Sequence, residues 1–161
     1  MVTSTGGRRR TLPTIDELQV WRAYVETAEA LRSELASRLQ SESSLSPGDY
    51  AVLLALSEAT DHHLRSSELA ANMGWERSRL SHHLGRMERR GLLRREDCES
   101  DNRGAEVVLT AEGAESFRRA SIPHLRAVRE LFVSALNPDQ LAAAQGIATA
   151  LRARLDASRD A

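Results

Sequence analysis

Apolar residues recur along the N-terminal part of the chain at every third or fourth position. The members of this stripe are Leu18, Trp21, Val25, Ala28, Leu31, Leu35 and Leu39. Such spacing places them on one face of a helix. Thr14 and Glu17 have the spacing of a capping box, so the helix is predicted from Thr14 to about Gln40. At about 1.5 Å per residue it would span roughly 40 Å and overhang a small domain, so we expect the stripe to pack against a second subunit.

Turn and cap residues divide the rest of the chain into further elements. Residues 41–45 are predicted to be a linker, after which Ser46 and Pro47 begin a helix that covers residues 50–59. Residues 60–64 are predicted to be a loop with at most a short strand. Near the C-terminus, Thr110 caps a helix that contains Pro123, so a kink or break is expected near Ile122. A capping box at 137–140 begins a last helix that ends near residue 155.

The centre of the chain has the pattern of a helix-turn-helix followed by a β-hairpin. Ser66 is predicted to cap a short helix that buries Leu69, Ala70 and Met73. Gly74 permits a tight turn, and a second helix follows over about 76–90. Gly91 ends that helix, and strands are predicted at 92–97 and 105–109 around a polar turn. The predicted fold class is therefore mainly α with a small β-hairpin wing.

Positive charge is concentrated in the same central segment. The whole chain has a formal net charge of −1, yet residues 65–95 contain eight arginines and three glutamates. A basic block in a nearly neutral protein indicates a localised surface for a polyanion. No other constellation suggests catalysis, because neither a nucleophile–base pair nor a carboxylate pair has useful spacing. We therefore expect no enzyme activity and no cofactor.

The second central helix separates into two faces when its residues are placed 100° apart. Leu80, Leu84 and Met87 share one arc and are predicted to face the core. The opposite half contains Ser78, Ser81, His82, Gly85, Arg86 and Arg89, with Arg79 at its flank. Arginine binds guanine edges or phosphates, and serine contacts either, so this face suits the major groove of DNA.

The turn of the hairpin supplies a second basic contact. Arg103 lies at the tip, and Asp101 is close enough in sequence to brace its guanidinium group. An arginine at such a tip can enter a narrow minor groove, although an ordinary turn with a solvated arginine is the alternative.

These residues resemble the MarR family of winged-helix regulators. The resemblance rests on the pattern from Ser66 to Gly91 and on the wing, in which Asp101-x-Arg103 leads into a strand that ends Leu109-Thr110. It implies a homodimer, formed by the first and last helices, that binds a pseudopalindromic operator on double-stranded DNA and usually represses. It also implies that a small molecule binds between the dimer helices and the winged-helix lobe in many members.

The residues predicted to contact DNA come from the helix-turn-helix and the wing. They are Arg65, Ser66, Ser67, Arg77, Ser78, Arg79, Ser81, His82, Arg86, Asp101 and Arg103. Candidates for contact with an aromatic or phenolic effector are Trp21, Tyr24, Tyr50, Phe117 and His124, for which core and dimer packing is the alternative role.

The predicted organisation is a disordered tail over 1–12 and one domain over 13–161. In that domain, residues 46–110 form the DNA-binding lobe, whereas 14–40 and 111–155 form the dimerisation helices. We expect a cytoplasmic protein, since no apolar run is long enough to span a membrane. We also expect no metal site, because adjacent histidines on a helix diverge and rarely share an ion. Two alternatives stay open: a winged helix that binds proteins instead of DNA, and a redox-sensing regulator that uses Cys98.

Overall fold

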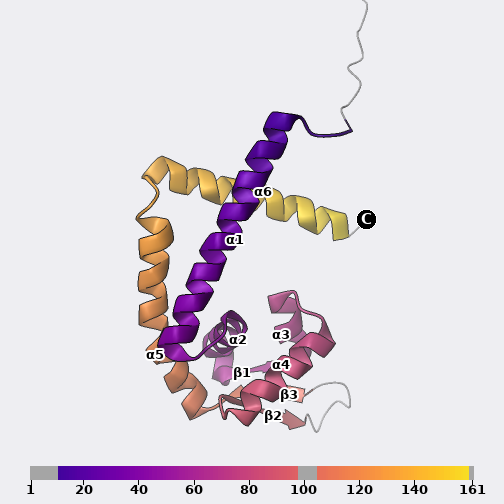
Figure 1. The fold of residues 1–161 in the computed structure, drawn as a ribbon. Helices are drawn as coiled ribbons and strands as arrows, with labels where there is room; N and C mark the ends of the chain where they lie inside the picture. The colour runs from indigo at the N-terminus through magenta and orange to yellow at the C-terminus, as the bar shows by residue number, and fades with distance from the viewer. Residues whose placement is uncertain (1–10, 98–104, 160–161) are drawn as a thin grey trace, which may run out of the picture. The chain divides into compact units, whose positions relative to one another are not determined.

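The computed structural model describes residues 11–97 and 105–159 of the 161-residue chain. Its helices are α1 (Ile15–Ser43), α2 (Pro47–Glu58), α3 (Ser66–Met73), α4 (Arg77–Arg89), α5 (Ala111–Val128) and α6 (Pro138–Arg159). A 3₁₀ turn (Thr60–His62) precedes β1 (His63–Arg65), and a π-helical turn (Arg129–Val133) follows α5. The other strands are β2 (Leu93–Asp97) and β3 (Ala105–Leu109) (Figure 1). The predicted fold class, helical with a small β-wing, is confirmed.

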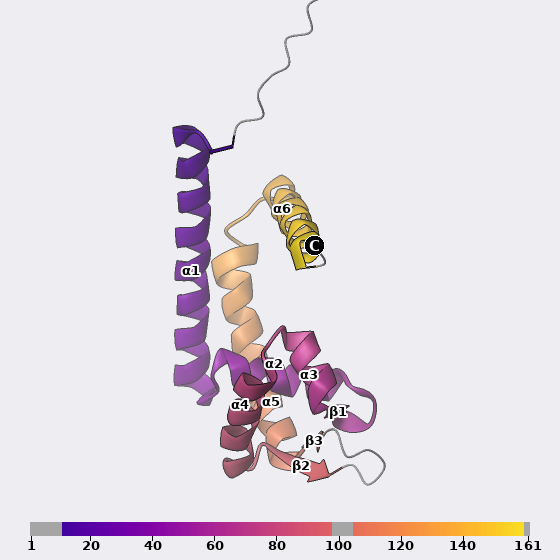
Figure 2. The same ribbon diagram turned by 90° about the vertical axis from the view of Figure 1, so that its right-hand side faces the viewer.

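The chain divides into two compact units, residues 1–34 and residues 35–161. In the first unit, the described residues are mainly the N-terminal part of α1, where the reciprocal bonds of the predicted capping box join Thr14 and Glu17. The second unit contains the remainder of α1 and all the other elements. In it, α2 contacts α3, α4, α5 and β3 and is the central element of the lobe (Figure 2).

A three-stranded antiparallel sheet closes one side of the second unit. Its strand order is β1-β3-β2, with His63 opposite Val108 and Leu93 opposite Leu109. The short strand that the sequence allowed within 60–64 lies at 63–65 and adds the third strand to the predicted hairpin. We call the hairpin formed by β2 and β3 the wing.

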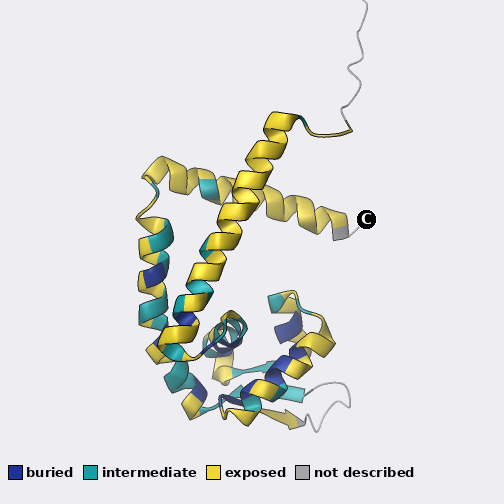
Figure 3. Ribbon diagram, viewed as in Figure 1, coloured by how far each residue is buried: buried dark blue, intermediate teal, exposed yellow. Residues whose placement is uncertain are grey.

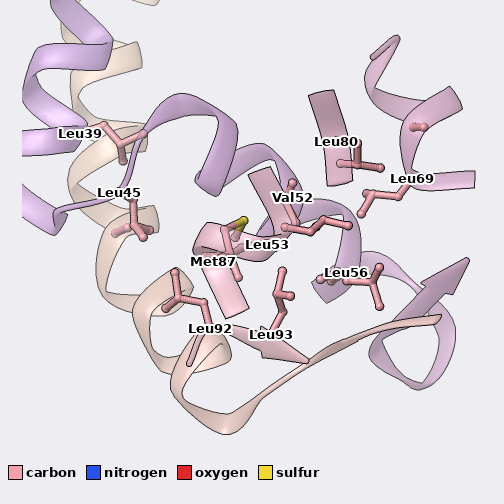
Figure 4. Close-up of a cluster of buried hydrophobic side chains, with 14 residues drawn as sticks. Leu39, Leu45, Val52, Leu53, Leu56, Leu69, Leu80, Met87, Leu92 and Leu93 are labelled. Atoms are coloured by element: carbon pink, nitrogen blue, oxygen red, sulfur yellow. The ribbon is translucent and has the colours of Figure 1, made fainter. Parts of the chain in front are cut away.

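One hydrophobic core joins the end of α1 and the helices α2 to α5 to the sheet. Val52, Leu53 and Leu56 of α2 are completely buried at its centre. Figure 4 shows ten labelled members of this cluster: Leu39, Leu45, Val52, Leu53, Leu56, Leu69, Leu80, Met87, Leu92 and Leu93. Since α3, α4 and the wing all contribute to one core, their relative placement is fixed by packing.

Local sequence signals account for most of the boundaries in this lobe. The Ser46 hydroxyl accepts a hydrogen bond from the Asp49 N–H, and the Asp49 carboxylate accepts one from the Ser46 N–H. Gly91 has a φ of 74°, and the N–H groups of Gly91 and Leu92 donate to the carbonyls of Glu88 and Met87. This Schellman arrangement ends α4 as predicted.

Two predictions near the serine-rich segments were wrong. The linker expected at 41–45 is helical as far as Ser43, where the Ser43 hydroxyl donates to the Leu39 carbonyl instead of ending the helix. Ser66 is not the N-cap of α3, because that position belongs to Arg65. The Ser66 hydroxyl donates instead to the Ala105 carbonyl of β3 at 2.7 Å, and the Glu68 carboxylate accepts a hydrogen bond from the Arg65 N–H.

The helices after the wing are longer than predicted. The break expected near Ile122 is absent, because α5 continues through Pro123 to Val128. The Ser134 N–H then donates to the Arg129 carbonyl, which gives the five-residue spacing of a π-turn. The last helix begins at the predicted capping box of Asn137 and Gln140 and ends at Arg159 rather than near 155.

Candidate nucleic-acid interface

The second helix of the helix-turn-helix, α4, presents one buried and one exposed face. Leu80, Leu84 and Met87 face the core and are at most 1% exposed, as the sequence predicted. The exposed residues of α4 are Arg77, Ser78, Arg79, Ser81, His82, Arg86 and Arg89 (Figure 3). These seven positions include four arginines, two serines and no acid. Such a surface attracts phosphate and offers donors to base edges.

A tryptophan in the turn before α4 orders one of these arginines. The guanidinium carbon of Arg79 lies 4.4 Å from the centroid of the Trp75 ring. This is a cation–π contact, and it fixes the side chain while leaving the edge of the guanidinium group available to a ligand. Gly74 makes the turn that brings Trp75 to this place, with a φ of 61°.

A hollow of about 240 Å³ lies between the N-terminus of α3, α4 and the wing. It is lined by Ser66, Ser67, Arg77, Leu80, Ser81, Leu84, Arg95 and Ala105. Two arginines and three serines around an apolar floor can receive an anion, and the helix N-terminus adds backbone N–H donors. This hollow continues the basic face of α4 toward the wing.

The wing arginine at this hollow is held by an acid of α4. The Glu88 carboxylate accepts hydrogen bonds from the Arg95 guanidinium group at 2.7 and 2.9 Å and from the Arg95 N–H at 2.9 Å. These bonds keep the pKa of Glu88 below its usual range. Glu88 therefore remains ionised and fixes Arg95 against the recognition helix, the name we use for α4.

Behind the recognition helix, a buried carboxylate joins α2 to α4. The Asp49 side chain is 6% exposed; its Oδ1 lies 3.0 Å from His83 Nε2, and its Oδ2 accepts from Arg90 Nη1 at 2.7 Å. Burial opposes ionisation, but the bonds from His83, Ser46 and Arg90 dominate and hold the pKa of Asp49 well below its usual range. Arg90 Nη2 also donates to the Ser44 carbonyl at 2.7 Å.

Comparison with known proteins decides the family. A family model described as the MarR family matches residues 43–104, which cover α2, the helix-turn-helix and part of the wing. Over 89% of this chain and 94% of the other, the fold superposes on Sco3205 of Streptomyces coelicolor, a MarR family transcriptional regulator solved in complex with DNA. The TM-score is 0.85 and the sequence identity is 38%. The chain belongs to the MarR family.

Two further MarR relatives support this assignment. AbsC of Streptomyces coelicolor, also a MarR family transcriptional regulator, is 38% identical over 89% of this chain and 99% of its own, with a TM-score of 0.79. The transcriptional repressor MprA of Escherichia coli is 27% identical over 107 residues, which are 66% of this chain and 60% of MprA. The chain thus matches less than two thirds of the length of that curated repressor. Members of the MarR family are transcription factors rather than enzymes.

The MarR fold gathers many of the predicted DNA contacts on one surface. Ser66, Ser67, Arg77 and Ser81 line the hollow, whereas the side chains of Ser78, Arg79, His82 and Arg86 lie along the exposed part of α4. Arg65 caps α3 beside them and is exposed. Three predicted residues, Cys98, Asp101 and Arg103, lie outside the described part of the chain.

Three of the five candidate effector residues form one aromatic cluster between α2 and α5. The Tyr50 ring centroid lies 5.2 Å from that of Phe117 and 4.6 Å from that of His124. Burial lowers the pKa of His124, and among the described residues its buried Nδ1 has no hydrogen-bond partner. Trp21 and Tyr24 belong to the other compact unit, where both are exposed.

Sequence reasoning missed several residues of this MarR site. The contact of Arg79 with Trp75 joins residues only four positions apart and could have been found as a local pair, although Trp75 lies in the turn before α4. The association of Arg95 with Glu88, and of Asp49 with His83 and Arg90, depends on tertiary packing and left no local signal. In residues 11–97 and 105–159, no group of three or more metal-ligating side chains is assembled, and no helix is long and apolar enough to cross a bilayer.

Proposed function

We propose that this chain binds double-stranded DNA as a homodimer, with the recognition helix in the major groove. The observation that carries the proposal is the exposed face of α4, which contains four arginines and no acid while its opposite face is locked into the core. Phosphates are held by the serines and arginines of the hollow, including Ser67 and Arg77. The sequence adds Arg103, braced by Asp101, as the minor-groove contact of the wing.

The terminal helices supply the surfaces for dimerisation. On α6, Leu141, Ile147, Leu151 and Leu155 are exposed and fall on one side of the helix at 100° per residue. On α1, Leu18, Trp21 and Val25 of the predicted stripe are also exposed. A single chain leaves these apolar faces in water, whereas a two-fold dimer buries them and places two recognition helices about one DNA turn apart, roughly 10 base pairs.

Replacing Arg86 with alanine is expected to weaken operator binding by about 1–3 kcal/mol, the usual loss for one specific arginine contact. The operator is first selected from a random DNA pool with the native protein, and affinity is then measured at one fixed salt concentration. Arg118→Ala is the control, since it removes the same charge from an exposed position of α5 that is paired with Glu115. Equal affinities of the two variants would contradict the proposed role of α4.

A salt titration distinguishes this function from that of a protein-interaction module. Each phosphate contact releases counterions, so the logarithm of affinity should fall with the logarithm of salt concentration with a slope near −0.9 per contact. Loss of the Arg77 contact with phosphate should reduce that slope by about one contact. A native protein that selects no sequence and shows no salt-dependent DNA binding would favour the alternative module.

Replacing Leu151 with glutamate is expected to convert the dimer into monomers, because a charge would be buried at the centre of the α6 stripe. Analytical ultracentrifugation gives the mass directly. Ala153→Glu introduces the same acid on the side of α6 opposite the stripe and should leave the dimer intact. A native protein that sediments as one chain would overturn the dimer.

For regulation, we propose that the protein is a repressor released by an aromatic or phenolic molecule. The cluster of Tyr50, Phe117 and His124 supports this role, because its rings contact one another at tilted angles and the buried Nδ1 of His124 can hydrogen-bond a ligand. In this scheme residues 46–110 bind DNA, and the flanking helices 14–40 and 111–155 set the distance between the two lobes. A screen of phenols for release of operator DNA tests the site. We expect a phenol that releases DNA from the native protein to have no such effect on Tyr50→Ala.

A further inference from the structure

The side chain of His83 lies beneath the exposed face of the recognition helix and is fixed from several directions. The residue is 8% exposed. Its ring meets the Trp75 ring edge-on, with 5.1 Å between centroids. A methyl group added at Gly48 would lie 2.9 Å from His83 Cε1, so the backbone of α2 leaves no room on that side. The imidazole can therefore act as a rigid support.

Both ring nitrogens face charged groups, and these groups dictate the positions of the protons. Nε2 lies 3.0 Å from Oδ1 of Asp49, a carboxylate that also accepts from Arg90 and from the Ser46 N–H. Nδ1 lies 2.9 Å from Arg86 Nη2. A guanidinium group only donates, so Nδ1 accepts and the single proton of the neutral ring lies on Nε2. Nε2 faces the Asp49 carboxylate at 3.0 Å without the alignment of a hydrogen bond, so the carboxylate favours a proton there through its charge. The two contacts together select the neutral Nε2–H tautomer.

Arg86 is the exposed end of this chain of contacts. One of its five N–H groups is directed to His83, and four remain for DNA. A long side chain that is already held loses less conformational freedom when it binds. The guanidinium group is thus placed on the DNA-facing surface before DNA arrives.

We propose that His83 is a positioning residue for DNA recognition: its buried imidazole holds the Arg86 guanidinium group on the groove face, and Asp49 fixes the tautomer that allows this. The inference rests on the proposed function, since it assigns a role to Arg86 in operator binding. It extends the DNA-reading site inward to two side chains that DNA does not touch.

Two substitutions distinguish the roles of the two ring nitrogens of His83. The side-chain amide oxygen of asparagine is as many bonds from Cα as Nδ1 is. His83→Asn therefore retains an acceptor for Arg86 and loses the contact with Asp49. The side-chain amide nitrogen of glutamine is as many bonds from Cα as Nε2 is. His83→Gln therefore retains a donor next to Asp49 and loses the acceptor for Arg86. We expect His83→Gln to bind the selected operator three- to tenfold more weakly than the native protein and His83→Asn to stay within twofold, although His83→Asn should unfold at the lower temperature.

Combination with Arg86→Ala completes the test. In that background, His83→Gln should cause no further loss of affinity, because the group it positions is gone. Weaker binding by His83→Asn than by His83→Gln, or additive losses in the double variant, would overturn the inference. If Arg86→Ala binds DNA with native affinity, the proposed contact of Arg86 with DNA is wrong. If Arg86→Ala binds more weakly and His83→Gln binds with native affinity, only the positioning role of His83 is wrong.

A spectroscopic measurement keeps the inference testable if a variant does not fold. ¹⁵N NMR of the native protein at pH 8 reports which imidazole nitrogen carries the proton. We expect a protonated Nε2 and an unprotonated Nδ1 for His83, with the Nδ1 signal shifted in Arg86→Ala. The opposite tautomer would overturn the assignment.

Discussion

Replacing Gly113 with alanine is expected to lower the free energy of unfolding by about 3 kcal/mol or more. Gly113 is buried in the first turn of α5, where its N–H donates to the Thr110 hydroxyl. A Cβ at this position would lie 1.9 Å from the Leu92 carbonyl oxygen and 2.9 Å from Leu109 Cδ1. The oxygen belongs to the backbone and cannot rotate away, so α5 must separate from the start of the wing.

Urea unfolding of the two forms measures this difference. Gly146→Ala is the matched control, because Gly146 lies in α6, has no positive φ, and has no neighbouring atom within 4 Å of the place that a Cβ would occupy. That substitution should be neutral or stabilise by up to about 1 kcal/mol, the difference in helix propensity. Equal stability of Gly113→Ala and the native protein would mean that the contact between α5 and Leu92 is not rigid.

Replacing Asp49 with alanine is expected to cost about 2–4 kcal/mol of stability at pH 7. The change removes one of the two bonds of the capping box of α2, the one from the Ser46 N–H, and leaves His83 and Arg90 without the carboxylate that each contacts. Because the folded-state pKa of Asp49 is depressed, the ionised carboxylate stabilises the fold most above its unfolded-state pKa of about 3.9. That contribution decreases as the pH falls below this value.

Urea unfolding at several pH values tests both the size and the sign. The difference between Asp49→Ala and the native protein should be largest near neutral pH and should shrink below about pH 4. Asp139→Ala, at an exposed acid in the first turn of α6, is the control for general loss of negative charge. A difference that grows on acidification would contradict the network.

Features that depend on neighbouring residues could be predicted from the sequence, and those that depend on distant ones could not. The caps at Thr14, Ser46 and Thr110 and the stop at Gly91 involve partners within five residues, so their patterns are local. Ser66 has the same local pattern, but its hydroxyl donates a hydrogen bond to the Ala105 carbonyl, 39 residues away in the sequence. A tertiary hydrogen bond therefore overrode the cap preference.

The same division holds within the candidate site. Helical periodicity was sufficient to separate the buried Leu80 and Leu84 from the exposed arginines of α4. It could not show that His83, which the structure buries, contacts Asp49 of another helix. Pro123 illustrates the opposite error, because the rule that proline breaks helices was applied to a helix that continues for five more residues.

The contacts of Asp49 also determine which motions are open to the recognition helix. His83 and Arg90 fasten α4 to the first turn of α2, and Arg90 reaches the Ser44 carbonyl at the corner between α1 and α2. Sliding or rolling α4 on its own would break an ion pair, a buried contact and a packed core together. For the regulation proposed above, we therefore expect an effector to turn the lobe of residues 46–110 as one body, with the hinge outside the α2–α4 pair.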